Sequence, residues 1–110
     1  MDFEIREERE REGILVVAVR GEVDLDTAGE LRRRLESRNG DVPPIVLDLT
    51  DCSFLDSVGI SLIVTASRRA DGNGGGAGFA VVAASESQAR RTLRLTNVDS
   101  RIAVLGSREA

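Results

Sequence analysis

Three short, mostly apolar runs dominate the hydrophobic pattern of the chain. They are "ILVVAV" at residues 14–19, "IVLDLT" at residues 45–50 and "FAVVAA" at residues 79–84. Runs of this length with few polar interruptions are typical of buried strands in a sheet that helices cover. The segment before the first run alternates weakly at Phe3 and Ile5, and Gly13 then supplies a turn signal. The chain is therefore predicted to open with a β-hairpin.

Between the first two runs, apolar residues recur at helical spacing. In "DTAGELRRRLESRNG", Ala28, Leu31 and Leu35 fall on one face, and arginines lie opposite them. Thr27 and Glu30 have the spacing of a capping box, in which a hydroxyl and a carboxylate bind free backbone N–H groups. The pattern predicts a helix that begins after Thr27.

Two further helices are expected after the second and third runs. One extends from Val58 to about Ala70, and the other lies in "SESQARRTLRL", where Ser85 and Gln88 are spaced as a second capping box. The segment "RIAVL" at 101–105 predicts a short final strand.

Strands that alternate with helices after an opening hairpin predict an α/β fold. We expect a mostly parallel mixed sheet with helices on one face. A chain of 110 residues can build one modest core, and neither an internal repeat nor a linker divides it. Residues 1–110 are therefore predicted to form a single domain.

The residue types that are missing exclude several classes of chemistry. The sequence has no His and no Lys, and Cys52 is its one cysteine. Ser-His-Asp and Cys-His catalysis, Schiff bases and thiolate or imidazole metal sites all need residues that are absent. We therefore predict a protein that is not an enzyme, with no catalytic residue, no metal site and no cofactor.

Charge and hydropathy limit the partners. The net charge is −4 and the pI is about 4.9, which argues against binding nucleic acid. The apolar runs are too short to span a membrane. The N-terminal "MDFEIREERERE" is charged where a signal peptide is apolar, and a lone cysteine suits a reducing compartment. These features predict a cytoplasmic protein.

One apolar run, "SFLDSVGISLIV" at residues 53–64, contains a polar pair at Asp56 and Ser57. Burying an unpaired carboxylate or hydroxyl is costly, so the pair is expected where a strand passes into a helix, with Ser57 as the N-cap. In parallel sheets, chemistry collects beyond the carboxyl ends of strands. We therefore expect the loops "GEVDLD" and "CSFLDS" to bring Asp24, Asp56 and Ser57 to one edge.

Three elements carry a resemblance to a known family. They are Gly21-Glu22-Val23-Asp24, "IVLDLTDCSFLDSVGI" at 45–60 and "LTNVD" at 95–99. In this order, over nearly the whole chain, they resemble the STAS domain family, and within it the bacterial anti-sigma factor antagonists. The most specific element is the Asp-Ser-x-Gly motif after an apolar strand.

The resemblance implies a function and a site. It implies that the unphosphorylated protein binds an anti-sigma factor with serine kinase activity and so frees a sigma factor. Ser57 matches the phosphoacceptor of the family, and its phosphorylation releases the antagonist. Asp24 and Asp56 match the acidic residues of the switch surface, to which Val58 and Gly59 are also assigned. A phosphatase is an optional further partner.

The chain departs from the family at a few positions. Val58 stands where many relatives have Ser or Ala, Asn97 replaces a common Gly, and the Gly72–Gly78 loop is longer than usual. Little sequence remains after the last predicted strand for a C-terminal helix. The changes at Val58 and Asn97 are expected to be tolerated, whereas the long loop and the short C-terminal segment affect partner specificity more than the fold.

Alternative functions remain open. Some STAS domains are subunits of lipid-transport ATPases, and others belong to stress-signalling scaffolds. A hydrolase with Ser57 as nucleophile lacks a His or Lys base. The sequence names neither the kinase nor the sigma factor, nor the triggering signal, and it leaves the oligomeric state open.

Three other residues have structural interpretations. Gly59 is expected to permit close approach of a neighbouring element or of the kinase. Cys52 is interpreted as a small buried hydrophobe, and Asp48 as a structural carboxylate at a strand end.

Overall fold

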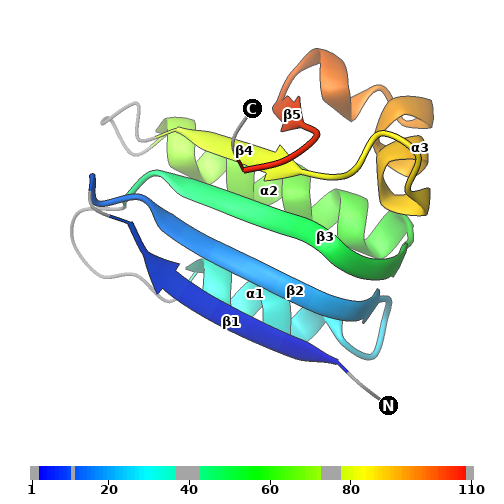
Figure 1. The fold of residues 1–110 in the computed structure, drawn as a ribbon, viewed down its shortest axis with the longest axis horizontal. Coiled ribbons are helices and arrows are strands. Elements are labelled where there is room, and N and C mark those ends of the chain that lie inside the picture. Colours follow the sequence, from blue (N-terminus) through cyan, green and yellow to red (C-terminus); the bar gives the residue numbers. More distant parts are fainter. Residues whose placement is uncertain (1–2, 11, 37–42, 73–77, 109–110) are drawn as a thin grey trace.

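A computed structural model describes residues 3–10, 12–36, 43–72 and 78–108 of the chain. Its five strands form one mixed sheet in the order β1-β2-β3-β4-β5 (Figure 1). The strands are β1 (Glu4–Arg9), β2 (Leu15–Val23), β3 (Ile45–Leu55), β4 (Phe79–Val82) and β5 (Ala103–Leu105). The β1–β2 pair is antiparallel and the other three pairs are parallel. The predicted hairpin and α/β alternation are confirmed.

The helices connect the parallel strands. They are α1 (Ala28–Glu36), α2 (Ser57–Gly72) and α3 (Gln88–Leu95), with a short 3-10 turn η1 (Val98–Ser100). Figure 1 shows α1 and α2 side by side behind the sheet, while α3 lies near the end of β3. Among the described residues, no helix lies over the face of the sheet that is turned to the viewer. This arrangement agrees with the predicted single helical layer.

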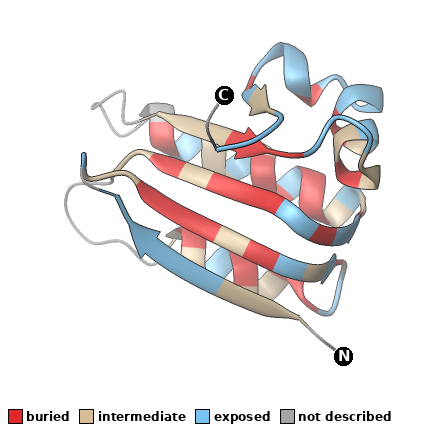
Figure 2. Ribbon diagram, in the orientation of Figure 1, coloured by how far each residue is buried: buried red, intermediate tan, exposed pale blue. Residues whose placement is uncertain are grey.

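The core between the sheet and the helices is aliphatic, as the scarcity of aromatic residues requires. Figure 2 shows its buried residues along β2 and β3. Each large aliphatic side chain that is removed from water contributes about 1.5 to 3 kcal/mol. The most deeply buried side chains are Leu31, Leu47, Leu49, Leu55, Ile63, Leu93, Val17, Val19, Val23, Val81 and Val82.

The turn of the hairpin depends on a glycine. Gly13 has a φ of 80°, in the region that L-residues with side chains avoid. The backbone N–H of Gly13 donates to the carbonyl of Glu10 at 3.1 Å, and the N–H of Glu10 donates to the carbonyl of Ile14 at 2.8 Å. The turn signal at this position is confirmed.

Strands β2 and β3 are longer than their apolar runs predicted. The expected loop "CSFLDS" is mostly strand, because β3 continues to Leu55 and pairs with the end of β2 through Glu22–Phe54 and Val23–Leu55. Register shifts between the two strands interrupt the regular pairing. Because these irregularities mix exposed and buried positions, the pattern of apolar runs does not reveal the carboxyl-terminal parts of the two strands.

The helix α3 also begins differently from the prediction. Ser87 caps it, with its hydroxyl accepting the N–H of Arg90 at 3.0 Å, so the proposed capping box of Ser85 and Gln88 is wrong. Gln88 instead bonds to β3, as described below. The predicted helix stop at Asn39-Gly40 and the centre of the Gly72–Gly78 loop lie outside the described residues. Within the described part of the chain, no helix is both long and apolar enough to cross a membrane.

Candidate functional site

The ends of β2 and β3 bring the candidate residues to one edge of the sheet. Val23 and Leu55 are partners in the parallel ladder, and each is followed by an aspartate. The backbone N–H of Asp56 donates to the carbonyl of Val23 at 3.3 Å, which joins the two turns directly. Asp24, Asp56 and Ser57 therefore lie at neighbouring turns, and we call these three residues the acidic rim.

Asp56, and not Ser57, caps α2. Its Oδ1 accepts the backbone N–H groups of Val58 at 3.0 Å and Gly59 at 3.2 Å, and its carbonyl accepts the N–H of Ile60 at 3.0 Å. The prediction that Ser57 is the N-cap is wrong. Both residue types are good caps, and the end of β3 at Leu55 places Asp56 at the cap position. Ser57 is the first residue of the helix, and it is exposed.

Asp24 has the same role in the turn that leads into α1. Its Oδ1 accepts the N–H groups of Asp26 at 3.0 Å and Thr27 at 3.2 Å, and its carbonyl accepts the N–H of Ala28 at 2.8 Å. The two aspartates of the rim thus make matching bonds to the residues two and three positions after them. Asp24 thus precedes α1, and Asp56 immediately precedes α2.

The predicted capping box of Thr27 and Glu30 is also wrong, because an aspartate earlier in the turn takes the cap position. Asp24 already binds the first N–H groups of the turn. The Thr27 hydroxyl is buried and donates to the carbonyl of Glu22 at 2.6 Å. The Glu30 carboxylate pairs with Arg33 at 2.7 Å.

Gln88 supports the rim from α3 and was missed by sequence reasoning. Its Oε1 accepts the N–H of Leu55 at 2.7 Å, and its Nε2 donates to the carbonyl of Leu55 at 3.0 Å. The side-chain amide of Gln88 thereby pairs both backbone groups of Leu55, the residue just before Asp56, as a neighbouring strand would. No local signal predicts this contact, because the partners are 33 residues apart.

Gly59 lies beneath the rim and is buried. A Cβ at this position would lie 2.9 Å from Cγ1 of Val23 and would collide with Cδ1 of Leu55. The close approach that Gly59 permits is therefore to β2 and β3 of its own chain. A buried glycine offers a partner no side chain, and the assignment of Gly59 to the switch surface stays a prediction.

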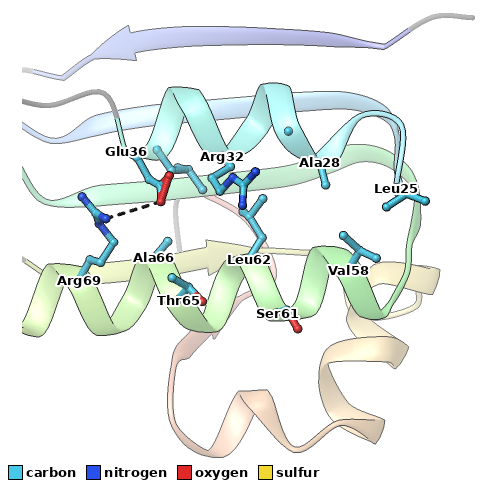
Figure 3. Close-up of a pocket in the computed structure, with 12 residues that line it drawn as sticks. Leu25, Ala28, Arg32, Glu36, Val58, Ser61, Leu62, Thr65, Ala66 and Arg69 are labelled. Atoms are coloured by element: carbon cyan, nitrogen blue, oxygen red, sulfur yellow. Dashed lines mark ion pairs between the residues drawn. The ribbon is translucent and has the colours of Figure 1, made fainter.

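Val58 opens onto a groove between α1 and α2 (Figure 3). The groove has a volume of about 400 Å³, and Leu25, directly after Asp24, lies at the same end as Val58. Leu25 is 78% exposed. Sequence reasoning missed Leu25, although an apolar residue between two aspartates in a turn was a visible signal.

Comparison with known proteins places this architecture in a family. The family model described as the STAS domain matches residues 6–109. The chain belongs to the STAS domain family. The predicted resemblance is confirmed.

Proteins similar to this STAS domain share one description. The anti-sigma-F factor antagonist RsfB of Mycobacterium tuberculosis (strain H37Rv) is 34% identical over 88 residues, which are 79% of this chain and 69% of RsfB. The crystal structure of an anti-sigma factor antagonist from Mycobacterium paratuberculosis has a TM-score of 0.84 at 30% identity, covering 98% of this chain and 89% of that one.

A third comparison concerns the fold alone. The anti-sigma factor antagonist SpoIIAA in its unphosphorylated form superposes with a TM-score of 0.70 at 19% identity, covering 96% of this chain and 91% of SpoIIAA. Its fold is therefore that of this STAS domain.

Asn97, which stands in place of a common Gly, has a φ of 64°. Asn tolerates this conformation better than most residues, so the substitution fits the backbone.

Two polar groups of the STAS domain are buried away from the rim. Asp48 lies within β3, where its carboxylate accepts the Nε–H of Arg108 at 2.6 Å and the N–H of Thr50 at 2.9 Å. Burial acts to raise the pKa of Asp48, but the hydrogen bonds from Thr50 and Arg108 outweigh it and hold the pKa below its ordinary value. Burial raises the pKa of the Cys52 thiol, which suits a small buried hydrophobe. Both positions fit structural roles.

Proposed function

We propose that this STAS domain is an anti-sigma factor antagonist controlled by phosphorylation at Ser57. The unphosphorylated form binds an anti-sigma factor with serine kinase activity in the cytoplasm, and a sigma factor is thereby released. Phosphate on Ser57 dissociates the complex, and a phosphatase restores the binding form. The observation that carries the proposal is an exposed serine hydroxyl on the first turn of α2, next to the carboxylate of Asp56. The similarity to the anti-sigma factor antagonists named above supports it.

The position of Ser57 allows modification without loss of the fold. Asp56 makes the capping bonds of α2, so phosphorylation of Ser57 removes none of them. A phosphate on the first turn also lies near the positive end of the helix dipole, where negative charge is favoured. The phosphorylated domain is therefore expected to stay folded.

The same modification changes the surface strongly. A phosphoserine adds about 1.5 to 2 negative charges next to Asp56 and close to the turn of Asp24. Juxtaposed like charges at an interface cost several kcal/mol, and about 1.4 kcal/mol already lowers affinity tenfold. If the partner surface binds the rim with its two carboxylates, one added phosphate is enough to dissociate a moderately tight complex.

Binding measurements with two replacements of Ser57 test this proposal. Each histidine-kinase-like anti-sigma factor encoded in the source genome is titrated calorimetrically with the parent, Ser57→Ala and Ser57→Asp. One of them is expected to bind the parent and Ser57→Ala alike, and to bind Ser57→Asp at least tenfold more weakly. Ser100→Asp, at an exposed serine in η1, adds the same charge away from the rim and serves as the control.

Two results would contradict the proposal. If no anti-sigma factor binds the parent, the domain is not an antagonist of this class. If Ser57→Asp binds as tightly as the parent, charge at Ser57 does not control the complex.

A further inference from the structure

The groove between α1 and α2 has the shape of a site for a third helix. On the α2 side, its lining residues recur three or four positions apart, as Val58, Ser61, Leu62, Thr65, Ala66 and Arg69. This spacing forms one continuous stripe along a helix. Since each residue adds about 1.5 Å, the stripe extends for about 16 Å, or three helical turns. An amphipathic helix of similar length fits such a stripe with its own i, i+3, i+4 and i+7 side chains.

The floor of the groove permits close packing. Ala28 and Gly29 on α1 and Ser61 and Ala66 on α2 all line the groove, and all four residues are small. Helices approach to about 8 to 10 Å between axes, and small side chains at the contact allow the closer distances. Two larger apolar side chains, Leu25 and Val58, lie at the end next to the rim (Figure 3).

Leu25 is suited to act as an anchor for a partner. Single exposed apolar residues are common and need no explanation, but Leu25 stands at the mouth of an apolar groove and directly after Asp24 of the rim. Val58, at the same end, directly follows Ser57. The acidic rim and the groove therefore form one continuous surface. A partner that covers the rim also contacts Leu25 and the open end of the groove.

The charges of the groove favour an acidic partner segment. Arg69 and Glu36 pair with each other at 3.6 Å, whereas no side chain among the described residues forms an ion pair with Arg32. Figure 3 shows Arg32 between the two helices, near Leu62. Counting the described residues alone, the groove thus carries one positive charge without an ion-pair partner beside apolar surface. A second copy of this chain would bring an identical cation, which opposes self-association through the groove.

We propose that this groove binds an amphipathic helix of the anti-sigma factor, with apolar residues on Leu25 and Leu62 and a carboxylate on Arg32. This inference rests on the proposed function and adds a second contact surface to it. The rim then holds the part of the interface that phosphate disrupts. The groove supplies apolar contact area and selects partners by the placement of an acidic residue.

Charge reversal in the groove tests the inference against a matched control. The anti-sigma factor that binds the parent is titrated with Arg32→Glu, Leu25→Ser and Arg33→Glu. Arg33 is the neighbouring arginine on α1, does not line the groove and pairs with Glu30. Arg32→Glu and Leu25→Ser are expected to bind at least tenfold more weakly, while Arg33→Glu stays within about threefold of the parent. Circular dichroism verifies that each variant is folded.

A probe on Thr65 separates groove binding from binding at the rim alone. Thr65 is exposed, lines the groove and lies about two turns along α2 from Ser57. A fluorophore on Thr65→Cys is expected to shift its emission when the anti-sigma factor binds. The same label on Ser100→Cys is expected to remain unchanged.

The outcomes distinguish this inference from the proposed function. If Ser57→Asp breaks the complex while Arg32→Glu and Leu25→Ser bind like the parent and the Thr65 probe stays silent, the groove proposal is wrong and the function stands. If no anti-sigma factor binds the parent, both are wrong. If light scattering shows a dimer that Leu25→Ser abolishes, the groove binds a second copy, which also overturns the inference.

Discussion

Asp56 and Ser57, at the start of α2, should differ sharply in their contribution to the free energy of unfolding. Asp56→Ala removes the Oδ1 that accepts the N–H groups of Val58 and Gly59. Loss of an N-cap costs about 1 kcal/mol, and loss of a negative charge at a helix N-terminus adds about 0.3 to 1 kcal/mol. We therefore expect Asp56→Ala to lower the free energy of unfolding by about 1.5 kcal/mol. For a chain of this size the melting temperature should fall by about 5 to 10 °C.

Ser57→Ala should leave stability within about 0.5 kcal/mol of the parent, because Ser57 is exposed and is not the cap. Asp56→Asn is the matched control, since its side-chain oxygen can still cap the helix. The chain has no Trp and no Tyr, so thermal and urea unfolding are best followed by far-ultraviolet circular dichroism. If Ser57→Ala is destabilised as much as Asp56→Ala, the assignment of the cap is wrong, and so is the argument that phosphorylation leaves the fold intact.

Other substitutions test the packing and the charges beneath the rim. Gly59→Ala forces a Cβ against buried Leu55 and should lower the free energy of unfolding by about 1 to 3 kcal/mol in urea, although Ala favours helices; a stabilised variant would refute the packing. Gln88→Leu leaves the N–H and C=O of Leu55 unpaired and should cost about 2 kcal/mol; unchanged urea unfolding would show that the bonds contribute nothing. The lowered pKa of Asp48 contributes stability that is present above the unfolded pKa of about 4 and is lost as pH falls through the folded pKa. The destabilisation by Arg108→Gln should therefore shrink in unfolding measurements below about pH 4, and a gap independent of pH would contradict this linkage.

The fold could be predicted because its central strands are apolar over much of their length. The runs that begin at Leu15, Ile45 and Phe79 stand out as apolar blocks, and the helices between them show helical periodicity. Parallel pairing then follows from the α/β alternation. The carboxyl ends of β2 and β3 were missed because register shifts there mix exposed and buried side chains.

The local chemistry of the rim was harder to predict. Asp56 and Ser57 are both strong N-cap residues, and only the position at which β3 ends decides between them. Thr27 satisfied a capping pattern, but Asp24 occupies the earlier cap position. The contact of Gln88 with β3 depends on tertiary structure, for which the sequence carries no local signal.

The groove could not be predicted from the sequence either. It exists because α1 and α2 lie side by side, which periodicity within one helix does not reveal. Within the described part of the chain, Glu36 pairs with Arg69 from α2, and no pattern within α1 reveals this partner. Which arginine of the "RRR" segment faces the groove therefore follows from the packing of the two helices.

Phosphate mapping tests the central claim most directly. The parent is incubated with ATP and each candidate anti-sigma kinase, and phosphopeptides are sequenced by mass spectrometry. One kinase is expected to place a single phosphate on Ser57, and Ser57→Ala should abolish the label. The nearby hydroxyl residues provide internal comparisons: Ser53 and Ser61 are exposed, and the Thr50 hydroxyl bonds to Asp48. A main site on any of these three, or no phosphate from any kinase, would contradict a switch at Ser57.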